Sequence, residues 1–298
     1  MYRLDRESFL SSPLIGFWSL LGFQAGFVNS FGFLACGRYV SHVTGFGTQV
    51  GLALGSSRFS LALELIGFPI AFIFGAAANG VLTSARLERG LRPRYDLTAA
   101  VLPVVLVAAA LAGHAGWLGP FEETPSDVSS FALLFGLAFL CGLQNGCFAT
   151  MTKGQIRTTH LTGISTDIGT DMARLLCGQL QGLERHMVIR ANASRLLTFA
   201  GFASGSILSV LATESVGYLA LMVPAATALI AAIVVIRIGQ AMDKAIFDPA
   251  LTSRLIDFAP SGVTASAPAP FSAVHTSAQK DLRFHRPHGP EPLAPKGP

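Results

Sequence analysis

Six apolar segments, each close to 20 residues long, set the strongest limit on how this chain can fold. They cover residues 14–37, 61–83, 97–117, 131–150, 196–213 and 216–238. A helix that rises about 1.5 Å per residue needs roughly 20 apolar residues to cross the hydrocarbon core of a bilayer. The segments do not alternate polar and apolar positions, which favours helices over barrel strands. We therefore predict an all-α, polytopic transmembrane helical bundle with about six spans.

The composition is typical of an integral membrane protein. Hydrophobic residues make up 51% of the chain and charged residues 13%, and the mean hydropathy is +0.53. Such a chain has too little polar surface to coat a water-soluble globule of this size. We expect the lipid bilayer as a partner, and no nucleic acid.

Basic residues in the linkers predict the orientation, because Lys and Arg that flank a span resist translocation. They follow the second, fourth and sixth segments, whereas the linkers after the third and fifth carry only acidic charges. Arg38 and Arg58, after the first segment, do not fit this alternation. The pattern predicts six crossings with both termini in the cytoplasm.

Two domains are expected. Residues 1–246 form the transmembrane domain, and residues 247–298 are rich in proline and cannot bury enough apolar area to fold, so we predict a disordered cytoplasmic tail. The four cysteines include no Cys-x-x-Cys pair, so neither a disulfide framework nor a thiolate metal site is expected. We predict no cofactor.

One polar phrase occurs twice. Residues 41–51 read SHVTGFGTQVG and residues 159–169 read THLTGISTDIG, which gives five identities in eleven positions. A second match precedes each copy, since GFQAG at 22–26 corresponds to GLQNG at 142–146. Two matched elements at similar separations indicate an internal repeat, with units at about 14–119 and 131–238.

Each repeat unit holds three predicted spans. Because three is odd, the second unit starts on the opposite side of the membrane, and the copies are inverted about an axis in the membrane plane. The pairs Thr44-Gly45 and Thr162-Gly163 combine a hydroxyl that competes for backbone hydrogen bonds with a residue free to adopt positive φ. We expect the helix to break at these pairs, as a broken or re-entrant segment, with Thr44 and Thr162 capping the helices that follow.

These residues resemble a known family. GFQAGFVNSFGFL at 22–34, SHVTG at 41–45, GLQN at 142–145 and RTTHLTG at 157–163 look like the YoaK family of bacterial multispan membrane proteins, domain-of-unknown-function family 1275. Phe46 departs from the family's usual Thr-Gly-Asn. The resemblance implies a multi-pass protein of the bacterial inner (plasma) membrane, and it supplies no substrate, cofactor or catalytic residue.

Eleven residues are candidates for a solute site: Gln24, Asn29, His42, Thr44, Thr48, Gln144, Asn145, His160, Thr162, Thr166 and Asp167. The amides either line a polar path or join helices by hydrogen bonds. The histidines either bind a solute or protons or cap chain turns, and a metal pair lacks matching carboxylates. Asp167 belongs either to a cation or proton site or to a salt-bridged surface with Asp171 and Arg174. Gly-x-x-x-Gly faces could also join two copies of the chain as a homo-oligomer.

Two functions remain open. The inverted repeat with matched polar segments favours a gradient-driven transporter or permease for a small solute, bound at the repeat interface. The alternative is a non-transporting membrane scaffold or assembly factor that recruits a partner through its tail and basic linkers. An intramembrane enzyme lacks a nucleophile and base set, so we predict no catalytic residues.

Overall fold

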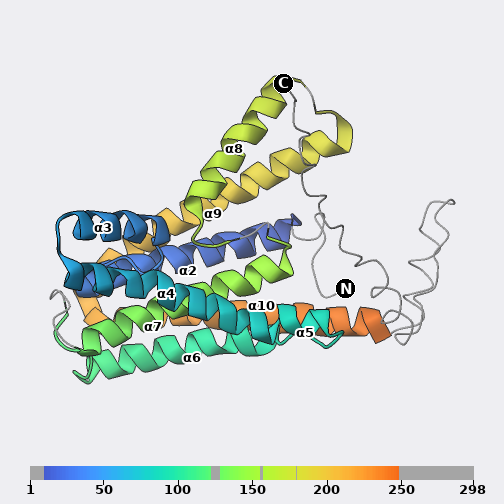
Figure 1. Ribbon diagram of the computed structural model, residues 1–298. Coiled ribbons are helices and arrows are strands. Elements are labelled where there is room, and N and C mark those ends of the chain that lie inside the picture. The colour runs from blue at the N-terminus through green and yellow to red at the C-terminus, as the bar shows by residue number, and fades with distance from the viewer. Residues whose placement is uncertain (1–9, 122–127, 155–156, 179, 248–298) are drawn as a thin grey trace, which may run out of the picture. The chain divides into compact units, whose positions relative to one another are not determined.

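The computed structural model describes residues 10–121, 128–154, 157–178 and 180–247 (Figure 1). Every regular element in these ranges is helical, which confirms the all-α prediction. The chain divides into two units, Met1–Phe247 and Asp248–Pro298. The predicted disordered tail lies outside the described residues.

The helices carry the labels of Figure 1. They are α2 (Ser12–Cys36), α3 (Val43–Gly55), α4 (Phe59–Leu82), α5 (Ser84–Glu88), α6 (Tyr95–His114), α7 (Val128–Met151), α8 (Leu161–Leu176), α9 (Gly182–Val216), the 3-10 helix η1 (Gly217–Leu221) and α10 (Met222–Phe247).

Five stretches are long and apolar enough to cross a membrane, so the chain is a multi-pass membrane protein. They are Ser12–Cys36, Phe59–Glu88, Tyr95–His114, Ser129–Met151 and Gly182–Ala241. The fifth has 60 residues and contains α9, η1 and α10, so the last two predicted spans fall within it. The chain turns back at η1 in Figure 1. Six crossings stay a prediction.

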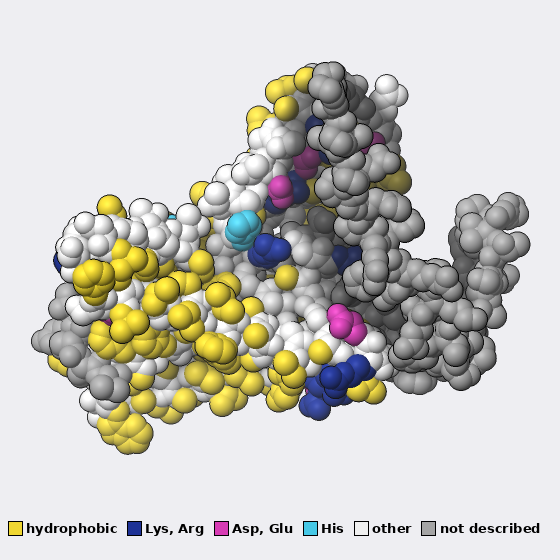
Figure 2. Space-filling model, viewed as in Figure 1, with side chains coloured by type: hydrophobic (Ala, Val, Ile, Leu, Met, Phe, Trp, Pro, Cys, Tyr) yellow, Lys and Arg dark blue, Asp and Glu magenta, His cyan; other side chains and the backbone are white. Residues whose placement is uncertain are grey.

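Large apolar side chains cover the outside of the bundle. On α4, Leu63, Ile73, Phe74 and Val81 are each more than 60% exposed, and Figure 2 shows hydrophobic side chains spread over this face. An apolar surface of this extent is costly in water and fits the hydrocarbon of a bilayer.

Glycines bring two pairs of helices into backbone contact. A Cβ at Gly26 of α2 would overlap the carbonyl of Phe202 in α9, and one at Gly205 of α9 would overlap the carbonyl of Phe23. The order of contacts along the two helices is the same, since Gly22 faces Thr198 and Gly26 faces Phe202, so α2 and α9 pack in parallel. The Gly-x-x-x-Gly faces are therefore used within one chain, and homo-oligomerisation stays a prediction.

The pair α4 and α7 is also parallel, since Gly67 of α4 faces Phe135 of α7 and Gly146 of α7 faces Asn79 of α4. A Cβ at Gly75 of α4 would overlap the carbonyl of Phe139 in α7, and one at Gly142 of α7 would overlap the carbonyl of Phe72. The first helix of each predicted repeat thus packs on the second long helix of the other. The remaining two long helices, α6 and α10, run antiparallel, since Gly113 meets Tyr218 at one end and Arg92 pairs with Asp243 at the other, at 3.0 Å.

Replacing Gly142 by Ala should lower the melting temperature of the purified protein in detergent. The added methyl group would force α7 away from α4, and overpacking of this kind costs about 1–3 kcal/mol. Gly136 lies in the same helix, but an added Cβ there meets no atom within 4 Å. Gly136→Ala is therefore the matched control and should be neutral or slightly stabilising. Equal losses in the two variants would contradict close helix contact at Gly142.

Candidate functional site

The segment after α2 folds back into the bundle. Gly37 ends α2 with φ 67°, a conformation that favours glycine. The Oδ1 atom of Asn29 then accepts hydrogen bonds from the Val40 amide at 3.2 Å, the Ser41 amide at 3.1 Å and the Ser41 hydroxyl at 2.9 Å. Asn29 lies seven residues before Cys36, the last residue of α2, which is about 10 Å along the helix axis. The segment therefore reaches well inside the end of α2.

The second copy uses another asparagine in the same way. Asn145 of α7 donates to the Thr159 hydroxyl at 3.0 Å and accepts from the Thr159 amide at 3.4 Å. Asn145 lies six residues before Met151, the last residue of α7, or about 9 Å along the axis. Ser41 and Thr159 are aligned in the repeat, but Asn29 and Asn145 are not. We call each hydrogen-bonded set an asparagine clamp.

The expected break at Thr-Gly is wrong. α3 begins at Val43 and α8 at Leu161, so Thr44 and Thr162 lie in the first helical turn instead of capping it. The residues at the N-cap positions are His42 and His160, whose side chains make no capping hydrogen bond.

The glycines of the phrase leave space for the histidine rings. A Cβ at Gly45 would lie 2.9 Å from the His42 ring, and a Cβ at Gly163 would overlap the His160 ring. Each imidazole folds over the first turn of its own helix, and only glycine three residues later leaves room for it. This contact explains why His and Gly recur together in both copies.

The first turns of α3 and α8 line a single cavity of about 690 Å³. Small-molecule sites in proteins have volumes of about 300–1,000 Å³. Six predicted residues line it: Asn29, His42, Thr44, Asn145, His160 and Thr162. The helices α4 and α9 complete the wall, through Pro69, Phe72, Ile73, Ala76 and Phe202. The two phrases, 118 residues apart in sequence, thus meet at one space, although their role in solute binding stays a prediction.

Three further polar residues of the wall are not among the eleven candidates. Ser41, Arg157 and Thr159 also line the cavity. Arg157 aligns with Tyr39 in the first copy, so a search for shared residues passes over it. On the face drawn in Figure 2, a histidine side chain and basic side chains lie together near the start of α8.

Two predicted residues farther along α3 and α8 lie outside this wall. The hydroxyls of Thr48 and Thr166 donate to the carbonyls of Thr44 and Thr162, at 3.3 and 3.1 Å. Each threonine thereby satisfies its hydroxyl within its own helix.

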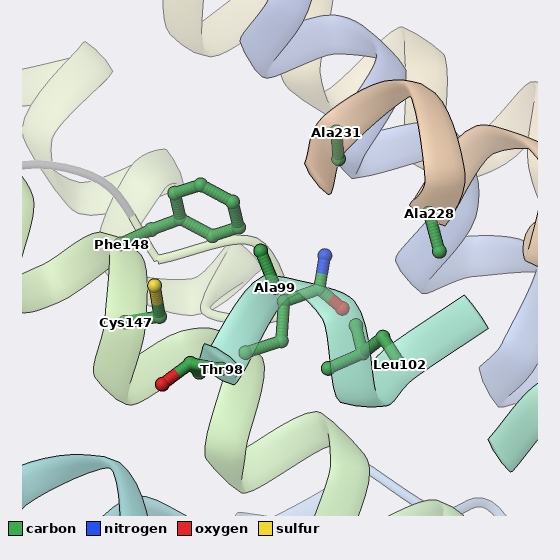
Figure 3. A pocket seen from close by; sticks show the side chains of 8 residues that line it. Thr98, Ala99, Leu102, Cys147, Phe148, Ala228 and Ala231 are labelled. Carbon is green, nitrogen blue, oxygen red and sulfur yellow. The ribbon is translucent and has the colours of Figure 1, made fainter. Parts of the chain in front are cut away.

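The two predicted glutamines are buried in the bundle and do not line the cavity. Gln24 is 1% exposed and Gln144 is 6% exposed. Among the described residues, Gln24 Oε1 and Gln144 Nε2 have no hydrogen-bond partner. Gln144 lines a separate space of about 10 Å³ between α6, α7 and α10 (Figure 3), which is close to the smallest volume that holds one water.

Asp167 and Asp171 form ion pairs that hold α8 on α9. Arg195 of α9 pairs with Asp167 at 3.2 Å and with Asp171 at 2.8 Å, and Arg174 pairs with Asp171 at 3.1 Å. Burial acts to raise the pKa of Asp171, but the hydrogen bonds and charges of Arg195 and Arg174 outweigh it and hold that pKa below its usual value. The salt-bridged interpretation therefore fits both carboxylates.

The corresponding contact in the first copy is apolar. Phe46 of α3 stacks on Phe68 of α4, with ring centroids 4.5 Å apart and planes 3° from parallel. In the alignment of the two copies, Phe46 corresponds to Ile164 and Asp167 to Gln49. The two copies therefore differ at Phe46 and Asp167, which attach α3 to α4 and α8 to α9.

Substitutions at the asparagine clamps should separate an acceptor from a donor role. Within the described chain, Asn29 forms hydrogen bonds through Oδ1 only. Asn29→Asp should therefore keep the three bonds, whereas Asn29→Ala should cost about 1–3 kcal/mol by leaving buried donors unpaired. Asn145 also donates, to the Cys141 carbonyl at 2.7 Å and to Thr159, so Asn145→Asp should be destabilising. Melting temperatures, with hydrogen exchange of the Val40 and Ser41 amides, give the comparison. Equal effects of Asn29→Asp and Asn29→Ala would contradict the first clamp.

Comparison with known proteins gives one match. Neither a curated protein nor a solved structure shows significant similarity to the chain. The family model described as "Protein of unknown function (DUF1275)" matches residues 17–234, a range that includes both phrases, both asparagine clamps and the cavity. The resemblance to domain-of-unknown-function family 1275 is thereby confirmed, and the chain belongs to the DUF1275 family of proteins of unknown function.

Proposed function

We propose that the protein is a gradient-driven permease for a small solute, which binds in the cavity lined by α3 and α8. The observation that carries this proposal is that both copies of the phrase line one cavity, although each follows a different long helix. Transporters built from inverted repeats place their sites where broken segments of the two copies meet. The volume of about 690 Å³ suits a small metabolite.

An inverted repeat with six crossings is supported by the pattern of helix packing. The repeat aligns α2 with α7, α4 with α9 and α6 with α10. The parallel pair of α2 and α9 therefore corresponds to the parallel pair of α7 and α4, and both pairs are joined through glycines. The antiparallel pair of α6 and α10 corresponds to itself. A two-fold axis in the membrane plane produces this pattern when three helices are duplicated and turned over.

The basic linkers support a bacterial inner-membrane orientation with both termini in the cytoplasm. Arg86, Arg89, Arg92 and Arg94 lie on and after α5, at the end of the bundle where Arg92 meets α10. Arg185 and Arg190 lie near the start of α9, and Arg190 donates to the Leu10 carbonyl, at 2.6 Å, beside the start of α2. These six arginines therefore lie at one end of the bundle, as the positive-inside rule predicts, whereas Arg38 and Arg58 lie at the opposite ends of α2 and α4.

Alternating access would follow from the unequal attachment of α3 and α8. The stack of Phe46 on Phe68 holds α3 against α4, whereas α8 contacts α9 through ion pairs. In an inverted repeat, exchanging the conformations of the two copies turns a cavity open to one side into a cavity open to the other. We assign α3 and α8 as the two gates.

Labelling with a membrane-impermeant maleimide tests this topology in oriented vesicles. Cys177, just after α8, is exposed, while Cys36, Cys141 and Cys147 are buried, so the native chain should label at Cys177 from the cytoplasmic side. Ser56→Cys, after α3 and in a Cys177→Ser background, should label only from the opposite side. Labelling of both positions from one side would refute the inverted repeat.

Solute movement through the cavity can be measured by light scattering of proteoliposomes under an osmotic gradient. The wild type should let one class of small solutes re-swell the vesicles faster than protein-free liposomes do. His42→Ala with His160→Ala should lower this rate roughly ten-fold or more, the usual scale for losing hydrogen bonds to a bound solute.

Two exposed histidines outside the cavity wall provide the control. His114→Ala with His186→Ala should leave the rate unchanged, because neither residue lines the cavity. A rate unaffected by the His42 and His160 pair would remove their role. Absence of solute movement, together with a cellular phenotype lost on deleting residues 248–298, would favour the scaffold function.

A further inference from the structure

We propose that the cavity binds a small oxyanion, such as a carboxylate, phosphate or sulfate group, and that Arg157 is its charge partner. This inference rests on the proposed function and names its solute class. The observation behind it is the composition of the cavity wall, which holds one guanidinium and two imidazoles. Among the described residues that line the cavity, none is acidic.

Among the described residues, Arg157 pairs with no carboxylate, unlike Arg38 and Arg195. Arg38 pairs with Glu64 at 3.5 Å, and Arg195 pairs with Asp167 and Asp171. In the part of the chain that the structure describes, Arg157 forms no ion pair and lines the cavity. The carboxylates that follow it most closely in sequence, Asp167 and Asp171, pair with Arg195 instead, so the described chain leaves the Arg157 charge to a ligand. A guanidinium recognises oxyanions through paired N–H donors.

The surroundings of Arg157 add to the same preference. Thr44 and Thr162 lie in the first turns of α3 and α8, where backbone N–H groups lack intrahelical partners and the helix dipole is positive. Their hydroxyls and the two histidines can donate further hydrogen bonds. A cation in this cavity would meet these positive groups without a carboxylate to offset them.

Binding of defined probes to the full-length protein in phosphatidylcholine nanodiscs tests the assignment. Succinate, phosphate and sulfate are the oxyanion probes, succinamide is the neutral match to succinate, and putrescine is the cation. At constant ionic strength, at least one oxyanion should raise the melting temperature in a saturable way. Arg157→Ala should weaken its apparent affinity roughly ten- to hundred-fold, and Arg157→Lys should weaken it less because the charge is kept.

Arg185 provides the matched control. It is exposed like Arg157, lies in the first turn of α9 and is absent from the cavity wall. Arg185→Ala makes the same change in net charge and should leave the affinity unchanged. Equal weakening by both variants would overturn the assignment, as would an absence of saturable stabilisation by every oxyanion.

The remaining outcomes separate this inference from the permease proposal. Stabilisation by putrescine or succinamide, but by no oxyanion, overturns the solute class and leaves the permease intact. Oxyanion binding that depends on Arg157, without solute movement in proteoliposomes, supports the binding site and removes transport. If nanodiscs with phosphatidylglycerol abolish the oxyanion effect in the wild type, a lipid headgroup is the ligand and the assignment to a soluble oxyanion is overturned.

Discussion

Backbone contact between parallel helices at glycine positions is the interaction on which the other features depend. Lipid tails are as apolar as the helices, so burial of apolar area gives little drive for helices to associate within a bilayer. Close approach allows dispersion contacts along the whole helix instead, and Gly26 and Gly205 permit it between α2 and α9, as Gly75 and Gly142 do between α4 and α7. Because each pair is held internally, the space between the pairs need not be filled. The cavity lies there, with α2, α4, α7 and α9 all contributing to its wall.

A cavity with polar walls inside a bundle also requires that every exposed backbone group find a partner. The segments that enter it are not helical, and in a bilayer an unpaired N–H group costs several kcal/mol. Asn29 supplies an acceptor for two such groups and Asn145 for one. The asparagine clamps thus make it possible for α3 and α8 to begin about 10 Å inside the ends of the long helices.

The sequence was sufficient for the large features and insufficient for the local ones. Apolar segment length predicts helices because it depends on bilayer thickness alone, and the repeated phrase pointed to the residues that share a cavity. The start of α3 was misplaced because Thr and Gly were weighed by their own preferences. Gly45 is required instead by its contact with the His42 ring. Arg157 and the pairing of Asn29 with Ser41 were missed because they involve residues that the two copies do not share.

The two copies of the phrase are attached to their neighbours by different forces, and this difference bears on the proposed exchange between two states. The stack of Phe46 on Phe68 is a dispersion contact between two rings, which is insensitive to ionic strength and pH. The contact of Asp167 and Asp171 with Arg195 is Coulombic, and the Asp167 side chain is 58% exposed, so salt screens part of it. Two copies with identical contacts would give two states of equal energy. Because α3 and α8 are attached by unlike forces, the two states of the proposed permease would differ in energy. Ionic strength would then change that difference by acting on the ion pairs of α8 and not on the ring stack of α3.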